Sequence, residues 1–362
     1  MVLEDVCELI ADCPHTTAPD EGKGYPLIRT PNVGKGRLLL EGVHRVSKDI
    51  YDKRNMRAIP QKDDIIFARE APAGNAALIR EGQEVCLGQR TVLIRPDCET
   101  VFPEYLVYYL LAPEQQYKLL GTANGATVAH VNLPVIRKMP IELPDIDVQQ
   151  KIAGYISIYD DLIENNQRQI KLLEEAAQRL YKEWFVDLRF PGYEDCKIVD
   201  GIPEKWERKK LVDIVDVQYG YAFDGSKFNS VGKGTPIIRI RNIPDGNTAD
   251  FTTEEAEEKY VISNGEILVG MDGKFHINSW SGKDAFLVQR TCCFRPRKRE
   301  MKGWLLWAIY EPIKFYEKTV VGATVSHLGK KHIDSIELLT GPEQLYIPFQ
   351  NYFELRQKLL NQ

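Results

Sequence analysis

Hydrophobic and polar positions along this chain of 362 residues follow two different rhythms. In residues 23–142, and again in residues 205–340, short β-branched or aromatic segments alternate with turns rich in Gly, Pro and Asn, a pattern typical of strands. Each region ends in a longer apolar pattern, at 103–120 and 303–318, that predicts one helix. We therefore expect two domains of the mixed α/β class.

The two regions are copies of one design, because four sequence blocks recur in the same order. The offset between the copies drifts only from 210 to 197 residues. A repeat of this length is far longer than a solenoid repeat, so we expect two separate globular domains with one architecture. The matched blocks are LIRTPNV at 27–33 with IIRIRNI at 237–243, DIIFA at 64–68 with EILVG at 266–270, QRT at 89–91 and 289–291, and GATVAH at 125–130 with GATVSH at 322–327.

Between the copies the apolar rhythm changes to a heptad. Spacings of four and three alternate from residue 152 to residue 184, and no Gly or Pro interrupts residues 155–186. This period predicts a coiled-coil helix, roughly 60 Å long if it spans 145–185. The alternative is an amphipathic helix that lies on its own domain. The seam positions are Ile152, Ile156, Tyr159, Ile163, Asn166, Ile170, Leu173, Ala177, Leu180 and Trp184.

A shorter version of this pattern follows Pro342 and breaks off at Gln362. A helix of that length covers about half of the long one, so we expect some apolar heptads to lack an intramolecular partner and to bind another chain. The bare stretch is expected at roughly residues 170–184 or beside them, depending on how the two helices dock. We expect subunit contacts through Ile163, Asn166, Ile170, Leu173, Leu180 and Trp184, with Asn166 fixing register or partner. The expected segments are a first domain at 1–143, a spacer helix at 144–186, a connector and second domain at 187–340, and a partial helix at 341–362.

Charge is distributed unevenly along the chain. The net charge of −5 by itself argues against DNA binding, because a DNA-binding surface needs Lys and Arg to displace counterions from phosphates. The domain regions are nevertheless positive, with 17 basic and 13 acidic residues in 23–142 and 21 and 18 in 205–340. The acidic excess lies in residues 1–22 and 143–187. This polarity is compatible with a DNA-facing surface but is a weak signal for one.

Motifs for catalysis are missing from the sequence. It holds no G-x-x-x-x-G-K-[ST] loop for ATP, no G-x-G-x-x-G fingerprint and no Asn-Pro-Pro-aromatic tetrapeptide for base methylation. The six His show no metal-ligand spacing and the seven Cys no C-x-x-C, so we expect no metal, and reduced thiols in a cytoplasmic protein. The first 14 residues carry four acids and no base, and no run of 18 apolar residues occurs, so we expect neither signal peptide nor membrane span.

Several motifs resemble the specificity (S) subunit of type I restriction-modification enzymes, along nearly the whole chain. Residues 141–144 (IELP) and 148–153 (VQQKIA) resemble the end of that family's first target recognition domain and the start of its central helix. Residues 180–187 (LYKEWFVD), 189–193 (RFPGY) and 202–206 (IPEKW) resemble the end of the helix and the start of the second recognition domain. The shortened last helix departs from the family, whose members usually carry one about as long as the first.

The resemblance implies a function and a set of partners. Each domain would read one half of a bipartite target in double-stranded DNA, and the helices would act as a ruler between the halves. Methyltransferase (M) subunits would dock on the helices, restriction/translocase (R) subunits would complete the complex, and the incomplete coiled coil would allow a homodimer. S-adenosylmethionine, ATP and Mg would belong to the partners, so we expect a non-catalytic chain without a cofactor of its own.

If the domains read different half-sites, residues identical in both copies cannot distinguish those sequences. The QRT triplets at 89–91 and 289–291 are then expected to brace a strand or contact phosphate. His130 and His327 are expected to follow the DNA backbone or to be satisfied within their own domain. Base readers should be long polar side chains where the copies differ. The candidates are Lys35, Arg37, Arg69, Asn75, Asn124 and Asn132 in the first domain, and Arg241, Lys274, His276, Asn278, Lys330 and Lys331 in the second.

A different class of function is the alternative interpretation of this pattern. Two β-rich modules on a coiled-coil strut also describe a non-enzymatic interaction protein that binds other proteins or glycans. Salt separates the two hypotheses, because binding driven by phosphate contacts weakens steeply as the salt concentration rises, whereas a protein or glycan interface loses far less.

Overall fold

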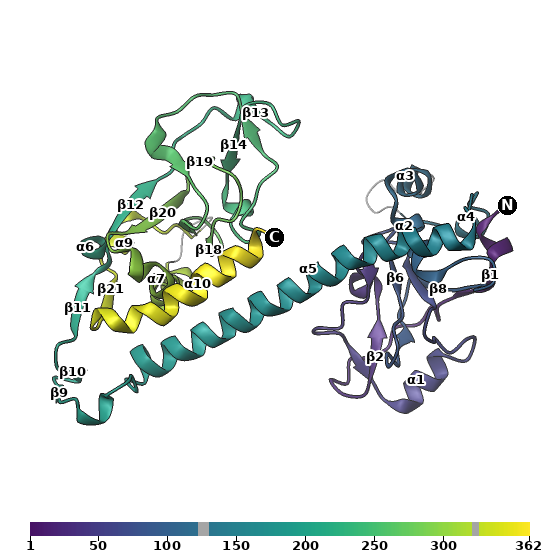
Figure 1. The fold of residues 1–362 in the computed structure, drawn as a ribbon, viewed down its shortest axis with the longest axis horizontal. Helices are drawn as coiled ribbons and strands as arrows, with labels where there is room; N and C mark the ends of the chain where they lie inside the picture. The colour runs from purple at the N-terminus through teal and green to yellow at the C-terminus, as the bar shows by residue number, and fades with distance from the viewer. Residues whose placement is uncertain (122–129, 321–325) are drawn as a thin grey trace. The chain divides into compact units, whose positions relative to one another are not determined.

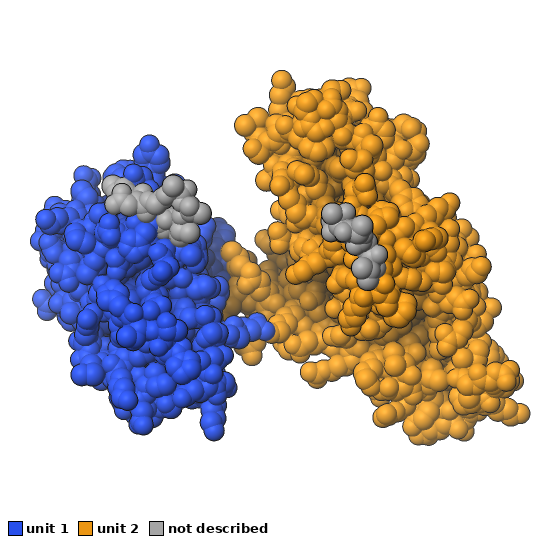
Figure 2. Space-filling model, turned by 180° about the vertical axis from the view of Figure 1, so that it is seen from behind, with its two compact units in different colours: residues 1–161 blue, residues 162–362 orange. Residues whose placement is uncertain are grey.

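The computed structural model describes residues 1–121, 130–320 and 326–362, which form two compact units. Unit 1 comprises Met1–Asp161 and unit 2 comprises Leu162–Gln362 (Figure 2). Both units combine sheets with helices, and the long helix α5, Ile146–Tyr181, contributes to both (Figure 1). The expected mixed α/β class, with a long helix between two sheet-rich parts, is confirmed.

Unit 1 is built on a five-stranded sheet with the strand order β1-β8-β5-β6-β3. Side chains alternate along β5, so that Ile65 and Phe67 belong to the cluster under α2, whereas Ile66 and Ala68 belong to the cluster on the opposite face. Because both faces are covered, the strand is a continuous apolar run in the sequence. The strands are β1 Cys7–Asp12, β3 Gly36–Arg37, β5 Ile65–Ala68, β6 Ala76–Leu78 and β8 Thr91–Pro96.

A small second sheet and short helices complete unit 1. Strand β2 pairs in antiparallel with β4 and in parallel with β7. The single helix predicted at 103–120 is wrong: the segment forms two helices, because Pro113 has no N–H and clashes with a continuing helix, and therefore begins α3. The bounds are β2 Tyr25–Ile28, β4 Arg45–Val46, β7 Cys86–Leu87, α1 Lys48–Arg54, α2 Pro103–Leu111, α3 Pro113–Gly121 and α4 Leu133–Arg137.

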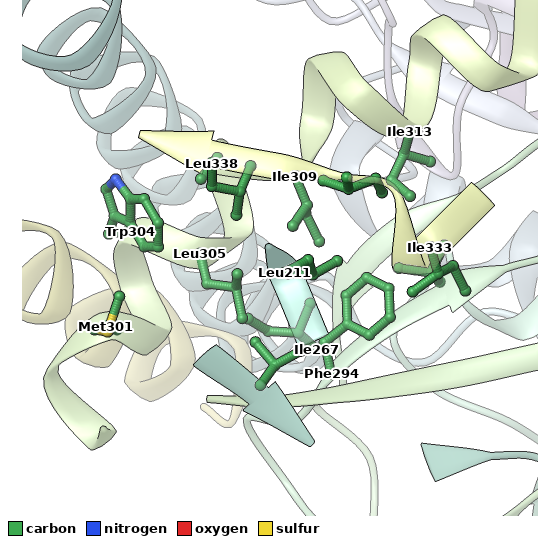
Figure 3. Packing of buried hydrophobic residues seen from close by; sticks show 14 of the residues in the cluster. Leu211, Ile267, Phe294, Met301, Trp304, Leu305, Ile309, Ile313, Ile333 and Leu338 are labelled. Carbon is green, nitrogen blue, oxygen red and sulfur yellow. The ribbon is translucent and has the colours of Figure 1, made fainter. Parts of the chain in front are cut away.

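Unit 2 repeats this plan. Its sheet β12-β20-β17-β18 corresponds to β1-β8-β5-β6, and β14 pairs in parallel with β19 as β2 does with β7. Leu305 of α7 shares a buried cluster with Ile267 and Phe294 of the sheet (Figure 3), while Leu268 and Cys293 belong to the cluster on the other face. The strands are β12 Val215–Tyr219, β14 Thr235–Ile238, β17 Ile267–Gly270, β18 Ile277–Ser279, β19 Ala285–Leu287 and β20 Thr291–Pro296.

The helices of unit 2 also differ from the simple expectation. The pattern at 303–318 forms two helices rather than one, with Pro312 in the first turn of the second, where a missing N–H is tolerated. The helices are α6 Leu211–Ile214, α7 Lys302–Ala308, α8 Tyr310–Thr319, α9 Lys330–Asp334 and α10 Ile347–Leu360. Shorter strands are β9 Ile198–Val199, β10 Ile202–Pro203, β11 Glu207–Lys210, β13 Phe228–Asn229, β15 Phe251–Thr252, β16 Val261–Ile262 and β21 Glu337–Thr340.

A glutamine fixes the same joint in both units. Gln149 Oε1 accepts a hydrogen bond from Phe102 N at 2.9 Å, just before α2. Gln350 Oε1 accepts one from Gly303 N at 3.2 Å, in α7. Gln149 and Gln350 therefore occupy equivalent places in the two units.

Helix α10 packs antiparallel on the second half of α5. The ring of Phe349 lies 5.9 Å from that of Trp184, and Asn166 Nδ2 donates to Gln362 Oε1 at 3.4 Å. The expectation that the heptads from Ile170 to Trp184 lack an intramolecular partner is wrong, because the core of unit 2 takes them up. Leu180 and Trp184 pack on the cluster that contains α7 and α10, and Leu173 lies with residues of these helices around one small pocket.

Among the described residues, the first half of the α5 seam has no such cover. Ile152, Ile156 and Tyr159 are 37, 38 and 69% exposed, and Ile163 is 54% exposed. We call Ile152, Ile156, Tyr159 and Ile163 the open seam.

Helix α5 has 36 residues, but charged side chains recur along its length. In the described part of the chain no helix is long and apolar enough to cross a membrane.

Candidate nucleic-acid interface

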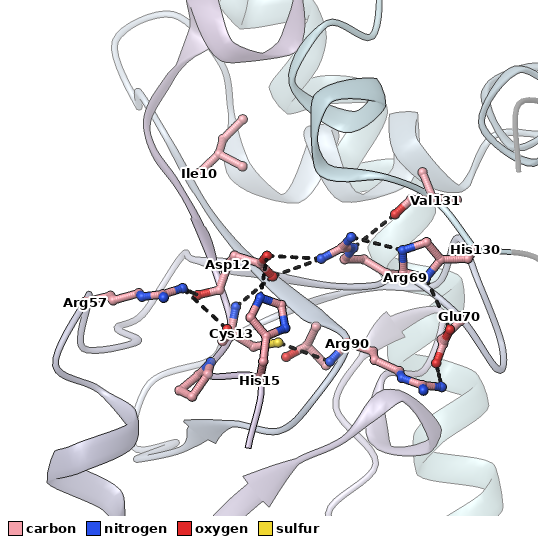
Figure 4. Close-up of polar contacts among 12 residues, drawn as sticks. Ile10, Asp12, Cys13, His15, Arg57, Arg69, Glu70, Arg90, His130 and Val131 are labelled. Carbon is pink, nitrogen blue, oxygen red and sulfur yellow. Dashed lines mark hydrogen bonds and ion pairs between the residues drawn. The ribbon is translucent and has the colours of Figure 1, made fainter. Parts of the chain in front are cut away.

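An arginine, a carboxylate and a histidine meet at one edge of the main sheet of unit 1. Glu70 follows β5, Arg90 precedes β8, and His130 precedes α4. Glu70 Oε2 lies 3.1 Å from His130 Nδ1, and the other carboxylate oxygen pairs with the guanidinium of Arg90 (Figure 4). The side chain of Glu70 is 10% exposed and that of Arg90 is 62% exposed. The carboxylate is thus a buried anchor for an arginine that reaches into solvent.

Unit 2 holds the same set at the equivalent place. Asp272 Oδ1 lies 2.6 Å from His327 Nδ1, and Asp272 Oδ2 lies 3.2 Å from Arg290 Nη1. The side chain of Arg290 is 58% exposed. We call Glu70, Arg90 and His130 the unit 1 triad, and Asp272, Arg290 and His327 the unit 2 triad.

The backbone that carries each triad has the same conformation and hydrogen bonds in both units. Arg90 O accepts from the N–H of Arg69 at 2.9 Å, and Arg290 O accepts from the N–H of Met271, also at 2.9 Å. Both arginines have a left-handed backbone, with φ of 65° and 70°. In each unit the threonine that follows the arginine donates its hydroxyl hydrogen to the carbonyl three residues earlier, which closes the turn. The expectation that the QRT triplets brace a strand is met for these threonines.

Beside the triads, the units differ in chemistry. In unit 1, Arg69 Nη1 lies 3.0 and 3.1 Å from the two carboxylate oxygens of Asp12, and Arg69 Nε donates to Val131 O at 3.0 Å. In unit 2, Tyr219 takes the place of Asp12 in the strand register and the buried Met271 takes the place of Arg69. An ion pair in one unit is therefore replaced by two largely apolar side chains in the other.

The hydrogen bonds of His130 indicate a neutral ring. Burial, followed by the charges of Arg69 and Arg90, lowers the pKa of His130 below its ordinary value. Arg69 Nη2 lies 3.0 Å from His130 Nε2 and can only donate, so Nε2 is the acceptor and Nδ1 carries the hydrogen that faces Glu70. His130 is thus satisfied within its own unit, one of the two alternatives expected for it.

Among the unit 1 candidates for base reading, two belong to the scaffold. Arg69 is 8% exposed and bonded on all sides, and Asn75 Nδ2 donates to Val33 O at 2.9 Å. These bonds give both side chains a structural role within the unit, and that they also read bases stays a prediction. Lys35 is exposed and Arg37 pairs with Asp161 at 2.5 Å. The half-buried Asn132 precedes α4, and Asn124 lies outside the described residues.

In unit 2 one candidate is likewise a scaffold residue. Asn278 Nδ2 donates to the carbonyls of Ile243 and Pro244, and its Oδ1 accepts from Arg356 at 2.9 Å. That Asn278 also reads bases likewise stays a prediction. Arg241 makes an exposed ion pair with Asp250 at 2.6 Å.

The remaining candidates in unit 2 gather on adjoining loops. Gly273 N donates to Ser326 O at 3.0 Å, which joins the turn that carries Lys274 and His276 to the segment before α9. Lys274, Lys330 and Lys331 are exposed. Burial, followed by Lys314 and Lys274, lowers the pKa of His276. Together with Arg290 and His327 these side chains form a basic edge, which we call the unit 2 edge.

A pocket of about 430 Å³ lies beside Arg90 in unit 1. Arg29 and Arg90 line it together with the hydroxyl residues Thr16, Thr17 and Thr30. Arg29 Nε is buried and has no hydrogen-bond partner within the described ranges. Arg54 is a third arginine in the lining, and guanidinium groups with several hydroxyls suit an anion.

No group of three or more His, Cys, Asp or Glu side chains is arranged to hold a metal ion in the part of the chain that the structure describes.

The carboxylate of each triad, Glu70 or Asp272, was not among the residues predicted from the sequence. The signal was present, because extending the DIIFA and EILVG match by two residues aligns Glu70 with Asp272.

Two similar mixed α/β units in one chain, connected by a long helix and each with basic side chains at the same edge, define a duplicated recognition protein without a visible catalytic centre in its described part. The chain belongs to the type I restriction modification DNA specificity domain family, whose model matches residues 1–175 and again residues 203–342. The resemblance seen in the sequence motifs is confirmed.

Individual relatives carry the same description. The type I restriction enzyme MjaIX specificity subunit of Methanocaldococcus jannaschii is 27% identical over 226 residues, which cover 60% of this chain and 51% of the relative. The HindI specificity subunit of Haemophilus influenzae is 28% identical over 367 residues, covering 80% and 79%. The chain thus spans about half the length of the first relative. The crystal structure of the type I restriction-modification S subunit from M. genitalium has a TM-score of 0.61 and 16% identity, covering 100% of this chain and 89% of that one, which shows a common fold.

Proposed function

We propose that this chain recognises DNA sequence for a type I restriction-modification complex, and that each unit reads one half of a bipartite target. The observation that carries the proposal is one scaffold used twice with different exposed polar side chains. The triads and their turns are equivalent in both units, whereas the exposed Lys274, Lys330 and Lys331 of unit 2 align with Pro72, Leu133 and Pro134 of unit 1. A scaffold that is the same in both units, with exposed polar side chains that differ between them, suits two half-sites of different sequence.

The chemistry on DNA belongs, in this proposal, to partner subunits. The sequence has no loop for ATP and no base-methylation tetrapeptide. Methyl transfer from S-adenosylmethionine would then reside in M subunits, and ATP- and Mg-dependent translocation and cleavage in R subunits. The chain by itself is a non-catalytic recognition subunit.

The open seam of α5 is the proposed contact with another chain of the complex. Its four side chains recur at heptad spacing and are 37 to 69% exposed. Burying a large apolar side chain contributes roughly 1.5 to 3 kcal/mol, so a row of them is a strong driving force for association. A methyltransferase subunit or a second copy of this chain could supply the cover.

Selection from a duplex DNA library with a randomised core tests the proposal. Sequences retained by the purified chain should share two short blocks separated by an unread spacer. Lys274→Ala combined with Lys330→Ala and Lys331→Ala should relax one block only, and Lys35→Ala should leave that block unchanged. Retention of all sequences alike, or insensitivity of binding to salt, would instead support the protein or glycan interaction module.

A further inference from the structure

We infer that Arg90 and Arg290 each hold a phosphate of the DNA backbone, so that both units are placed on their half-sites by the same contact, which is independent of base sequence. This inference rests on the proposed function. It names the chemical group, a backbone phosphodiester, that the exposed arginine of each triad binds.

Backbone conformation is the first argument. Arg90 and Arg290 have φ of 65° and 70°, a region that favours glycine because a Cβ is crowded there. A turn that only had to connect two strands would be easier to build with glycine. Both copies nevertheless place an arginine at this position, which indicates that the side chain has a role that outweighs the strain.

That role is not packing, because both side chains are largely in solvent. They are 62% and 58% exposed. Each guanidinium forms an ion pair with the carboxylate of its triad, which orients the group. A guanidinium has five N–H donors, so other donors remain for a phosphate.

The identity of the two triads argues against base reading. Arg90 and Arg290 follow the same turn and meet an equivalent carboxylate and histidine. A contact that is the same in both units cannot distinguish two different half-sites, whereas a phosphate is the same at every base pair. Phosphate contacts set the position of a protein on the duplex, and base contacts then specify sequence.

Unit 1 offers additional support in the pocket beside Arg90. Arg29 lines the same pocket and its buried Nε has no partner among the described residues. The equivalent Arg239 of unit 2 instead lies over the ring of Phe228, with its guanidinium carbon 5.6 Å from the ring centroid. Unit 1 can therefore hold its phosphate with two arginines and unit 2 with one.

The experiment measures the dissociation constant of the full chain for two unrelated duplexes over a series of salt concentrations. Arg90→Gly and Arg290→Gly are the test variants, because glycine suits the left-handed backbone and keeps the turn. Each should lower the slope of log affinity against log salt by about one, equally for both duplexes, and the double variant by about two. Arg90→Lys should keep the slope, because it retains the charge.

Arg299→Ala is the matched control, since Arg299 is an exposed arginine that also pairs with a glutamate, Glu354, and should leave the slope unchanged. Unchanged slopes in Arg90→Gly and Arg290→Gly, with wild-type binding intact, overturn the inference and spare the proposed function. A loss confined to one of the two duplexes also overturns it, because it would identify a base contact. Failure of the wild-type chain to bind either duplex overturns the proposed function and the inference together.

Discussion

The pair formed by Asp12 and Arg69 shows how one scaffold position accepts opposite chemistries. The arginine side chain is 10% exposed and the aspartate 18%, so each charge depends on the other for much of its solvation. The equivalent Tyr219 and Met271 of unit 2 need no such compensation, and burial raises the pKa of Tyr219 to about 12. We therefore expect that the aspartate and arginine of unit 1 can be replaced by the tyrosine and methionine of unit 2 only if both residues change together.

Arg69→Met should therefore destabilise unit 1 by about 3 kcal/mol, because it leaves the carboxylate of Asp12 without its partner. The double change Asp12→Tyr with Arg69→Met should recover most of this loss. Urea unfolding followed by circular dichroism measures the effect. All five tryptophans lie in unit 2, so tryptophan fluorescence should show an unchanged transition for that unit in every variant. A double variant that is no more stable than the single one would contradict the pairing.

At this scale the sequence predicts which residues are polar but not what they bind. Asn75 and Asn278 differ between the copies and have base-reading side chains, yet they donate to carbonyls 42 and 35 residues away in the chain. Such partners come together only through the tertiary fold. Within residues 1–121, 130–320 and 326–362 the exposed candidate lysines have no comparable partner, so for them the sequence-based prediction stays a prediction.

A histidine side chain contributes to the cap of helix α9. Gly329 N donates to His332 Nδ1 at 3.0 Å, and the imidazole stacks on Tyr316 with ring centroids 5.1 Å apart. Only the neutral ring can accept this hydrogen bond. Burial, followed by the charges of Lys331 and His327, lowers the pKa of His332 below its ordinary value of 6.5.

A histidine whose folded-state pKa is lowered contributes stability that is present above its unfolded pKa and is lost as the pH falls from that value through the folded-state pKa. We expect unit 2 to lose stability as the pH falls below about 6.5. His332→Gln should reduce this dependence, because a glutamine at this position caps the helix without titrating. Tryptophan fluorescence during urea unfolding at several pH values provides the measurement. Parallel losses in wild type and variant would assign the dependence to other groups.

Long elements were predictable because their signal is local and repeated. The heptad over residues 152–184 defines α5, and apolar runs define the central strands of both sheets. Which half of α5 is covered was not predictable, because it depends on where Phe349 meets Trp184 and Tyr181, a contact across more than 160 residues. The breaks at Pro113 and before Pro312 carried a local signal that the apolar pattern obscured.

At the scale of the whole molecule, introducing aspartates into the two halves of the α5 seam should have different effects on stability and on association. Leu173→Asp with Leu180→Asp should destabilise unit 2 by about 3 kcal/mol or more, because both side chains pack against its core. Tryptophan fluorescence during urea unfolding reports this loss. The sequence alone had favoured these two positions as a surface for another chain.

Ile152→Asp with Ile156→Asp is the matched change in the open seam. It should leave the stability of both units nearly unchanged and weaken association with a methyltransferase subunit or with a second copy of the chain. Sedimentation of the variant with and without that subunit distinguishes the cases. Association that survives this change would place the interface elsewhere.

The pairing of Asp12 with Arg69 has a consequence for how such proteins acquire new targets. The two residues are 57 positions apart in the sequence but within one unit, as are Tyr219 and Met271. A recombination event that replaces a whole unit transfers both members together and keeps the fold. A crossover inside a unit separates them and places an aspartate against a methionine or a tyrosine against an arginine. Selection would therefore favour inheritance of each unit as an undivided cassette, whatever DNA sequence it recognises.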